Sequence, residues 1–509
     1  MAFLCGCSAS VRMDPSDVRI ERDPDTPIPP FRFSASDEAL LEEIQRASFL
    51  FLWESCDPET GMVYDRSAVS DVHVASVAGI GFQLAALPVA VERGWITRAE
   101  GEDRAERILS AIASNPNNRK AGLFYHFVDA RDGGPTREAY EKVVSTIDSA
   151  LFFAGAIVCG QYFGDEVERI GDELLSEADW TFFQGGARDT SEEAGFVSLG
   201  WAPRDKDDPT GDGDLLPGYW LDSGAEHRLI MFLAAAAPKE SHRISAEQYY
   251  RLRRHLGEWN EIGKMVYLPW SGALFTAFFD HCFIDYAGAG MDDPGVHTDV
   301  PRARVDWWEN SRRLSLMNRE RAIENPLGLP TFGANAWGLT AMDTVHGYGV
   351  PGLFPMPLEF VNAMPGRDYA EVHVEDQWGR PIPSGEMYVP GDAWGDGTIA
   401  PYGAGSAIMF LPDQSVAAMR WMRNLKDSDG EPVVWRAPRD GGYGFLDSFN
   451  LGTGWIAHDY VAIDQGPLVL AIENARTGLI WELFHKHEWV KEAMDRLGMD
   501  RDSRTLLTE

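Results

Sequence analysis

The chain has 509 residues, 44% of them hydrophobic, so it can bury a large core, and its formal net charge at pH 7 is −34. An acidic protein is repelled by nucleic acid and by anionic membrane surfaces, which excludes both as expected partners. The balance suits an enzyme that acts on a neutral or cationic substrate, although a solvated acidic surface would give the same charge.

The N-terminal residues Met1–Cys7 resemble the end of a bacterial lipoprotein signal, with Cys7 as a possible lipid anchor. No basic region and no full apolar segment precede them. The Asp- and Pro-rich sequence that follows predicts a flexible tether, so that residues 1–33 form an N-terminal tether. We expect a periplasmic or cell-surface protein, or a cytoplasmic one if the N-terminus is complete as given. No stretch predicts a membrane-spanning segment.

Apolar residues recur at helical spacing over most of residues 34–500, which predicts a single domain without sequence repeats. The predicted helices lie near 40–51, 73–93, 97–114, 145–163, 165–183, 225–237, 245–257, 270–284, 303–322, 405–424 and 463–497. Long loops follow most second helices, and those at 185–222 and 343–404 are the longest. Helices in hairpin pairs with elaborated loops on one face indicate an all-α toroid of inner and outer helices.

Tryptophan is common, with 17 residues, and many lie in loops beside Gly, Pro or Asp. A ring in a polar, turn-rich loop is a better platform for a ligand than a ring in a helical stripe. The tryptophans that we expect to contact substrate are Trp220, Trp270, Trp337, Trp394 and Trp455.

Glu226 is the first candidate for a proton donor. It follows the loop Tyr219–Gly224 and opens an apolar helix, with Trp220 and His227 beside it. Apolar walls raise the pKa of a carboxyl group toward that of a proton donor. The alternative is electrostatic, because Glu in a first turn is favoured by the helix dipole by about 0.3–1 kcal/mol.

Asp447 is the best candidate for a second carboxylate, because Tyr443 and Asn450 give it a sugar-friendly setting. An Asx turn explains the same residue equally well. Asp396, in Gly395–Pro401, is either a third residue of the site or part of a turn.

Asp148 opens another apolar helix, where a capping role is the default, with Ser145 or Thr146 at the N-cap. Tyr125 and His126 place an aromatic and an ionisable group near the same helix end. The acidic loop 205–214 could hold Ca²⁺, but it lacks the EF-hand pattern, so we expect a solvated loop and no metal site.

Taken together, these motifs resemble the bacterial glucoamylase-like family that includes the endo-β-1,2-glucanases of glycoside hydrolase family 144. The matching pieces, in family order, are Ser145–Asp148, the helix start at Glu226, Trp337–Asp343 with Gly347–Gly349, Asp396–Pro401, and Asp447–Asn450 with Glu473–Asn474. They span roughly residues 40–490.

The resemblance implies an (α/α)₆ barrel that hydrolyses a β-linked glucan, most simply a β-1,2-glucan or its oligosaccharides, with inversion and without a cofactor. By position, Glu226 would be the general acid, Asp447 the general base and Asp148 a supporting residue of the site. Asp343 would join the substrate-binding residues.

The segment 364–392 departs from the family by lengthening a loop, and such an insertion could close one end of a cleft and change the mode of attack. Two other functions stay open: a glucan transglycosylase or cyclising enzyme, and a non-catalytic surface glycan-binding lipoprotein. A polysaccharide lyase is disfavoured, because lyases neutralise a uronate with cations and Arg and Lys are sparse around these motifs.

Overall fold

The computed structural model describes residues 14–67, 73–136, 141–185, 194–206, 208, 210–269, 271–345, 347–358 and 396–499. This part of the chain is mostly helical, with α1 (Ala35–Glu54), α2 (Val77–Glu92), α3 (Arg98–Ser114), α4 (Thr146–Phe163), α5 (Asp165–Glu177), α6 (Ala225–Ala235), α7 (Glu247–Arg251), α8 (Phe275–Phe278), α9 (Tyr286–Ala289), α10 (Trp307–Glu324), α11 (Pro401–Ser406), α12 (Pro412–Asn424), α13 (Ala462–Arg476), α14 (Leu479–Lys486) and α15 (Glu488–Leu497). The strands are short: β1 (Arg19–Ile20), β2 (Val74–Ser76), β3 (Arg119–Lys120), β4 (Leu123–Phe124), β5 (Phe127–Asp129), β6 (Val144–Ser145), β7 (Gly200–Pro203), β8 (Gly213–Leu215), β9 (His255–Trp259), β10 (Gly263–Tyr267), β11 (Arg304–Val305), β12 (Met342–Thr344), β13 (Gly347–Gly349), β14 (Met356–Pro357), β15 (Trp435–Arg436), β16 (Gly444–Phe445), β17 (Phe449–Asn450) and β18 (Trp455–Ile456).

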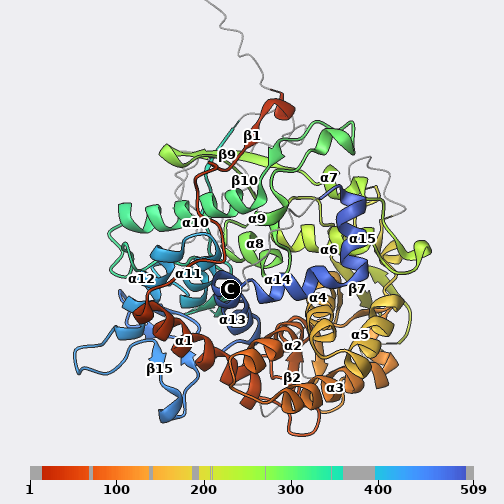
Figure 1. Cartoon of the computed structure of the whole chain (residues 1–509), viewed down its shortest axis with the longest axis horizontal. Coiled ribbons are helices and arrows are strands. Elements are labelled where there is room, and N and C mark those ends of the chain that lie inside the picture. The colour runs from red at the N-terminus through yellow and green to blue at the C-terminus, as the bar shows by residue number, and fades with distance from the viewer. Residues whose placement is uncertain are drawn as a thin grey trace, which may run out of the picture.

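The helices divide into an inner and an outer group. The helices α2, α4, α6 and α13 bury nearly all of their side chains. The helices α3, α5, α12 and α15 bury one face and expose the other, as amphipathic surface helices do. In Figure 1 the first group lies toward the middle of the molecule, and α1, α3, α5 and α12 lie around it. By length and composition alone α4 could cross a membrane, but 89% of its apolar window is buried inside the protein, as in a core helix.

Close backbone contacts set the inner helices against one another. The helix α2 packs against both α4 and α13. A Cβ atom on Gly155 of α4 would lie only 1.9 Å from the backbone oxygen of Gly81 in α2. A Cβ atom on Gly79 would lie 2.8 Å from the Cβ atom of Ala462. Because both of these last residues belong to first turns, the N-terminal ends of α2 and α13 lie side by side.

Short strand pairs determine where two inner helices begin. The strand β2 pairs with β5 and ends at Ser76, whose side chain caps α2. The strand β6 pairs with β7 and ends at Ser145, whose side chain caps α4. Elsewhere β7 also pairs with β8, β9 lies between β10 and β14, β12 pairs with β13, β15 with β16 and β17 with β18. The strand pairs therefore fix which residues stand in the first turns of α2 and α4.

Several predicted helices are wrong in their extent. The helix predicted at 245–257 ends at Arg251, and β9 begins at His255. Residues 271–284 form only the short α8 and a 3₁₀ turn. The prediction at 405–424 is divided before Pro412, which opens α12, and that at 463–497 is three helices. The apolar spacing persists through these breaks because the successive pieces bury side chains in one core.

Residues 14–33 are packed against the body of the molecule, so the predicted flexible tether is wrong for them. The strand β1 pairs with β11 in parallel, and Ile20 is fully buried. The backbone N–H of Phe31 donates to the carbonyl of Ala475 at 2.7 Å. Cys7 and the predicted insertion at 364–392 lie outside the described residues, so the lipid anchor and the insertion stay predictions.

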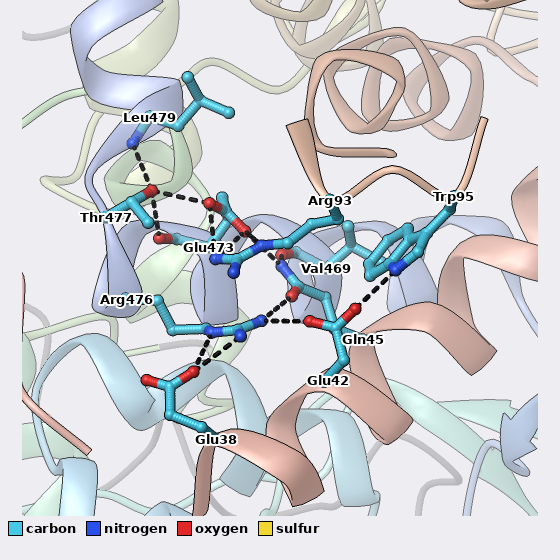
Figure 2. A network of polar contacts seen from close by, with 10 residues as sticks. All are labelled: Glu38, Glu42, Gln45, Arg93, Trp95, Val469, Glu473, Arg476, Thr477 and Leu479. Carbon is cyan, nitrogen blue, oxygen red and sulfur yellow. Dashed lines mark hydrogen bonds and ion pairs between the residues drawn. The ribbon is translucent and has the colours of Figure 1, made fainter. Parts of the chain in front are cut away.

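A polar network holds the last turn of α13 to α1 and to the end of α2 (Figure 2). Arg93 donates two hydrogen bonds of 2.9 Å to the carboxylate of Glu473. Arg476 in turn reaches Glu38 of α1 at 2.7 Å. Glu473 lies about 13 Å along the helix from Asp464 in the first turn. The Glu473–Asn474 part of the C-terminal motif therefore belongs to the scaffold and not to the group of acids around Asp464.

Candidate active site

Acidic side chains gather at the N-terminal ends of the inner helices. Asp148 stands in the first turn of α4, Glu226 in that of α6 and Asp464 in that of α13. The start of a helix carries a partial positive charge, which favours acidic groups there. Asp447 contacts Asp464 from the preceding loop. The backbone carbonyl of Asp65 accepts the N–H of Ala462 at the start of α13.

Glu226 is well suited to hold a proton. Its side chain is half-buried in the first turn of α6, which begins after Gly224 without a side-chain cap. Burial raises the pKa of its carboxyl to about 8, and the negative charges of Asp148 and Asp280 add to this, against the opposing charge of His126. At neutral pH the group is therefore protonated, as a proton donor must be.

Asp148 and His126 form an ion pair beside Glu226. The backbone N–H of Asp148 donates to Ser145 Oγ, which confirms the predicted cap at this helix end. His126 Nε2 lies 3.5 Å from Asp148 Oδ1, and its Nδ1 lies 3.0 Å from Glu141. Burial lowers the pKa of His126, but Asp148 and Glu141 outweigh burial and raise it to about 9. A cationic imidazole thus stands between two carboxylates.

Asp447 is a second buried acid, 1% exposed. The backbone N–H of Asp343 donates to its Oδ2 at 2.5 Å. Burial raises the pKa of Asp447 well above its usual range; the hydrogen bond with Asp464 opposes this, and the charge of Asp343 adds to it. Asp343 therefore lies beside Asp447, as its place in the family motif implied.

Arg66 connects the two acidic groups. Its guanidinium lies 3.0 Å from Asp343, 3.4 Å from Asp459 and 3.6 Å from Asp65. Burial lowers the pKa of Arg66, but Asp343 leads the neighbouring carboxylates that raise it above its usual value. Burial raises the pKa of the Asp65 carboxyl, and the charge of His126 in turn acts on Asp65 and lowers it. A continuous chain of charged groups therefore runs from His126, next to Glu226, to Asp343, next to Asp447.

Two predicted aromatic contacts lie near this chain. Trp220 is mostly buried, and its Nε1 donates to Thr146 Oγ1 in the first turn of α4 at 2.8 Å. This bond ties the loop that carries Glu226 to the helix that carries Asp148. Tyr125 lines a cavity of about 230 Å³, which it shares with Glu141 and Lys142.

Two other aromatic predictions are wrong or are explained by packing. Trp337 is completely buried, so no substrate can stack on its ring. Tyr443 packs its ring against Phe51 of α1 at 5.7 Å and against Tyr460 at 5.3 Å. A loop position beside glycine did not reveal that Trp337 is covered or that Tyr443 packs against other rings.

The loop residues near Asp447 mostly hold the backbone. Asn450 donates to the carbonyl of Asp396 and accepts from the N–H of Gly452, so both ends of its amide are used within the loops. Asp396 Oδ1 accepts from the N–H of Thr398, which is the turn that we considered. Trp455 is half-buried on β18, paired with Asn450. Trp270 and Trp394 lie outside the described residues.

Three charged residues of the site were missed from the sequence: Asp65, Arg66 and Asp464. Asp464 could have been found, because it opens an apolar helix just as Asp148 and Glu226 do. The other two lie in a loop with no distinctive pattern.

In the acidic loop, Asp214 pairs with Arg204 at 2.7 Å and Asp208 accepts from Thr210. Within the described ranges no three His, Cys, Asp or Glu side chains are placed to hold a metal ion.

The family model named Glycoamylase, described as a glucoamylase, matches residues 218–488, just over half of the chain. The chain is 26% identical over 500 residues to an exo β-1,2-glucooligosaccharide sophorohydrolase (non-reducing end) of Parabacteroides distasonis, a match that covers 91% of this chain and 58% of that protein. The chain thus spans well under two thirds of this curated relative.

Two solved structures share the fold. A glucoamylase-like protein of Bacteroides uniformis aligns with a TM-score of 0.71 and 26% identity, over 92% of this chain and 98% of that one. An endo-β-1,2-glucanase of Chitinophaga pinensis, solved with sophorotriose and glucose, aligns with a TM-score of 0.69 and 23% identity, over 91% and 98% of the two chains.

Proposed function

Because the chain belongs to the Glycoamylase family, we propose that it is a glycoside hydrolase acting on β-1,2-linked glucan or its oligosaccharides. The observation that carries this proposal is the pair of acids of raised pKa, Glu226 and Asp447, joined by a charged chain at one end of the inner helices. The relatives named for β-1,2-linked substrates support the choice of linkage.

In this proposal Glu226 is the general acid. Its carboxyl is protonated at neutral pH and gives its proton to the glycosidic oxygen as the bond to the anomeric carbon breaks. Asp148 and the cation of His126 lie beside it, and the negative charge of Asp148 helps to keep the proton on Glu226 until the leaving oxygen takes it.

Asp447 is the general base. It takes a proton from a water molecule that attacks the anomeric carbon from the opposite face of the sugar, which inverts the configuration. The backbone N–H of Asp343 holds this carboxylate in place, and Arg66 in turn pairs with the side chain of Asp343. Room for the water requires the two carboxyl groups to be about 6.5–9.5 Å apart when substrate is bound.

The helical arrangement supports an (α/α)₆ barrel as the scaffold. We assign α2, α4, α6, α8, α11 and α13 to the inner layer, since successive members of this series pack on one another and α11 returns to α13. The ring centroids of Phe278 in α8 and Tyr402 in α11 lie 6.2 Å apart, so these two helices of the series are also in contact. The candidate acids then stand at one end of this layer.

The test is chromatographic analysis of products from linkage-defined glucans, with the wild-type chain, Glu226→Gln and Asp447→Asn. We expect products from β-1,2-linked substrates only, and a loss of turnover of about 10²–10⁴-fold in each variant because a proton transfer is removed. NMR of the first product should show the inverted anomer.

The matched control is Glu258→Gln, because Glu258 is an exposed glutamate on β9 away from the acids. It should act like the wild-type chain. A well-folded Glu226→Gln variant with full activity would remove Glu226 from the mechanism. Cleavage confined to another linkage would contradict the proposed β-1,2-linked substrate.

A further inference from the structure

Asp447 has a partner that the proposed mechanism does not use. The carboxyl of Asp464, in the first turn of α13, is hydrogen bonded to that of Asp447 and also faces the hydroxyl of Tyr402. Asp464 is completely buried and Asp447 is 1% exposed. Two acids are thus pressed together with almost no access to solvent.

The donors around this pair are too few for two carboxylates. Within the described residues, Asp447 Oδ2 receives the N–H of Asp343, but Asp447 Oδ1 and both oxygens of Asp464 lack a donor in hydrogen-bonding geometry. The hydroxyl of Tyr402 donates its proton to the carbonyl of Ala341 at 2.7 Å. Three buried carboxyl oxygens therefore receive no proton from any other group that the structure describes.

A single proton between the two acids resolves this shortage. Two adjacent carboxylates in a buried site cannot both be ionised, and the pair then holds one proton over a wide pH range. Leaving a buried acceptor without a donor destabilises the folded protein, so a carboxylic O–H that reaches across is strongly favoured. Among the residues that the structure describes, the cation near the pair is Arg66, which already lies between Asp343, Asp459 and Asp65.

We propose that Asp464 is a positioning residue, which stays protonated and donates its O–H to Oδ1 of Asp447. Asp464 is the member that keeps the proton because, within the described part of the chain, neither of its oxygens has an N–H donor, whereas Asp447 accepts the N–H of Asp343. Asp447 keeps the negative charge, held at Oδ2 by the N–H of Asp343 and at Oδ1 by Asp464. The catalytic part of this inference rests on the proposed function, but the shared proton does not.

Two substitutions of Asp464 distinguish the loss of its hydrogen-bond donor from a change in its charge. Asp464→Asn keeps an N–H donor toward Asp447, whereas Asp464→Leu keeps the approximate volume and removes the donor. We expect Asp464→Asn to stay within about threefold of wild-type kcat, and Asp464→Leu to lose about 10²-fold in kcat with little change in KM. The acidic limb of kcat/KM should hold its place in the first variant. In the second it should move up by about one pH unit or more, because Asp447 loses a donor to its charged form.

Infrared difference spectroscopy at neutral pH tests the proton without any substrate. The wild-type spectrum minus that of Asp464→Asn should contain the C=O band of a protonated carboxyl group. The control is Asp57→Asn, because the buried Asp57 accepts the N–H groups of Glu59 and Thr60 and so has donors of its own. Its difference spectrum should contain only ionised-carboxylate bands. Circular dichroism and denaturation confirm that each variant is folded.

The outcomes distinguish the two proposals. If Asp464 were ionised, Asp464→Asn would remove a like charge and move the acidic limb to lower pH, and the protonated band would be absent; either result overturns the inference. If the chain hydrolyses no glucan but the band is present, the shared proton stands and the proposed function fails.

Discussion

The replacement of Glu226 by Gln should change how stability depends on pH. Burial raises the pKa of Glu226 to about 8, against 4.5 for an unperturbed glutamate. The folded state thus binds the proton more tightly than the unfolded state, so the stability that this group contributes is complete below pH 4.5 and is lost as pH rises to about 8. At about 1.4 kcal/mol per pH unit, the whole interval corresponds to about 5 kcal/mol. Since the side chain is half-buried and keeps some solvent, we expect about 2–4 kcal/mol of this.

The assay is urea unfolding of both proteins at several pH values from about 5 to 8.5. Gln cannot ionise, so the difference in unfolding free energy between Glu226→Gln and the wild-type chain should rise in favour of the variant by about 2–4 kcal/mol across this range. Other acids titrate in both proteins and cancel in the difference. Glu258→Gln, at an exposed site, should show no such rise. Parallel pH profiles for Glu226→Gln and the wild-type chain would refute a buried, proton-holding Glu226.

Four other predictions concern activity and packing. In the wild-type chain, kcat/KM for a β-1,2-linked oligosaccharide should fall above about pH 8, because Glu226 then loses its proton. Arg66→Met should lower kcat by at least about tenfold while circular dichroism stays unchanged, since Asp343 loses its cation; unchanged kcat would contradict its positioning role. Glu473→Gln should lower the free energy of unfolding in urea by about 3 kcal/mol, because a buried ion pair with Arg93 is broken. Gly155→Ala should lower the Tm by several degrees, because the added Cβ atom would clash with the backbone of α2.

The position of two acidic residues at the starts of buried helices could be predicted from the sequence. The resemblance to the glucoamylase-like family is confirmed by the family match. Asp148 and Glu226 do stand in first turns of buried helices, because an acid placed just before an apolar run has both a dipole and a core to position it. Asp464 follows the same rule and was overlooked because no local pattern shows that it contacts Asp447.

The rest depended on long-range contacts that no local pattern encodes. Trp337 looked exposed beside Gly338, yet neighbouring segments cover it completely. The breaks in the predicted helices arise where a new segment enters the same core, as at Pro412. Arg66 gains its importance from Asp343, which lies far along the chain. Spacing along one segment cannot reveal such partners.

The helix α13 carries a buried acid, Asp464, in its first turn and the Glu473–Arg93 ion pair in its last turn. Asp464, which affects proton binding at the site, and Glu473, which contributes to thermal stability, thus lie at opposite ends of one helix. Laboratory evolution could accordingly raise thermal stability through the ion pairs between Arg476 and α1. The pH optimum of activity should then stay unchanged.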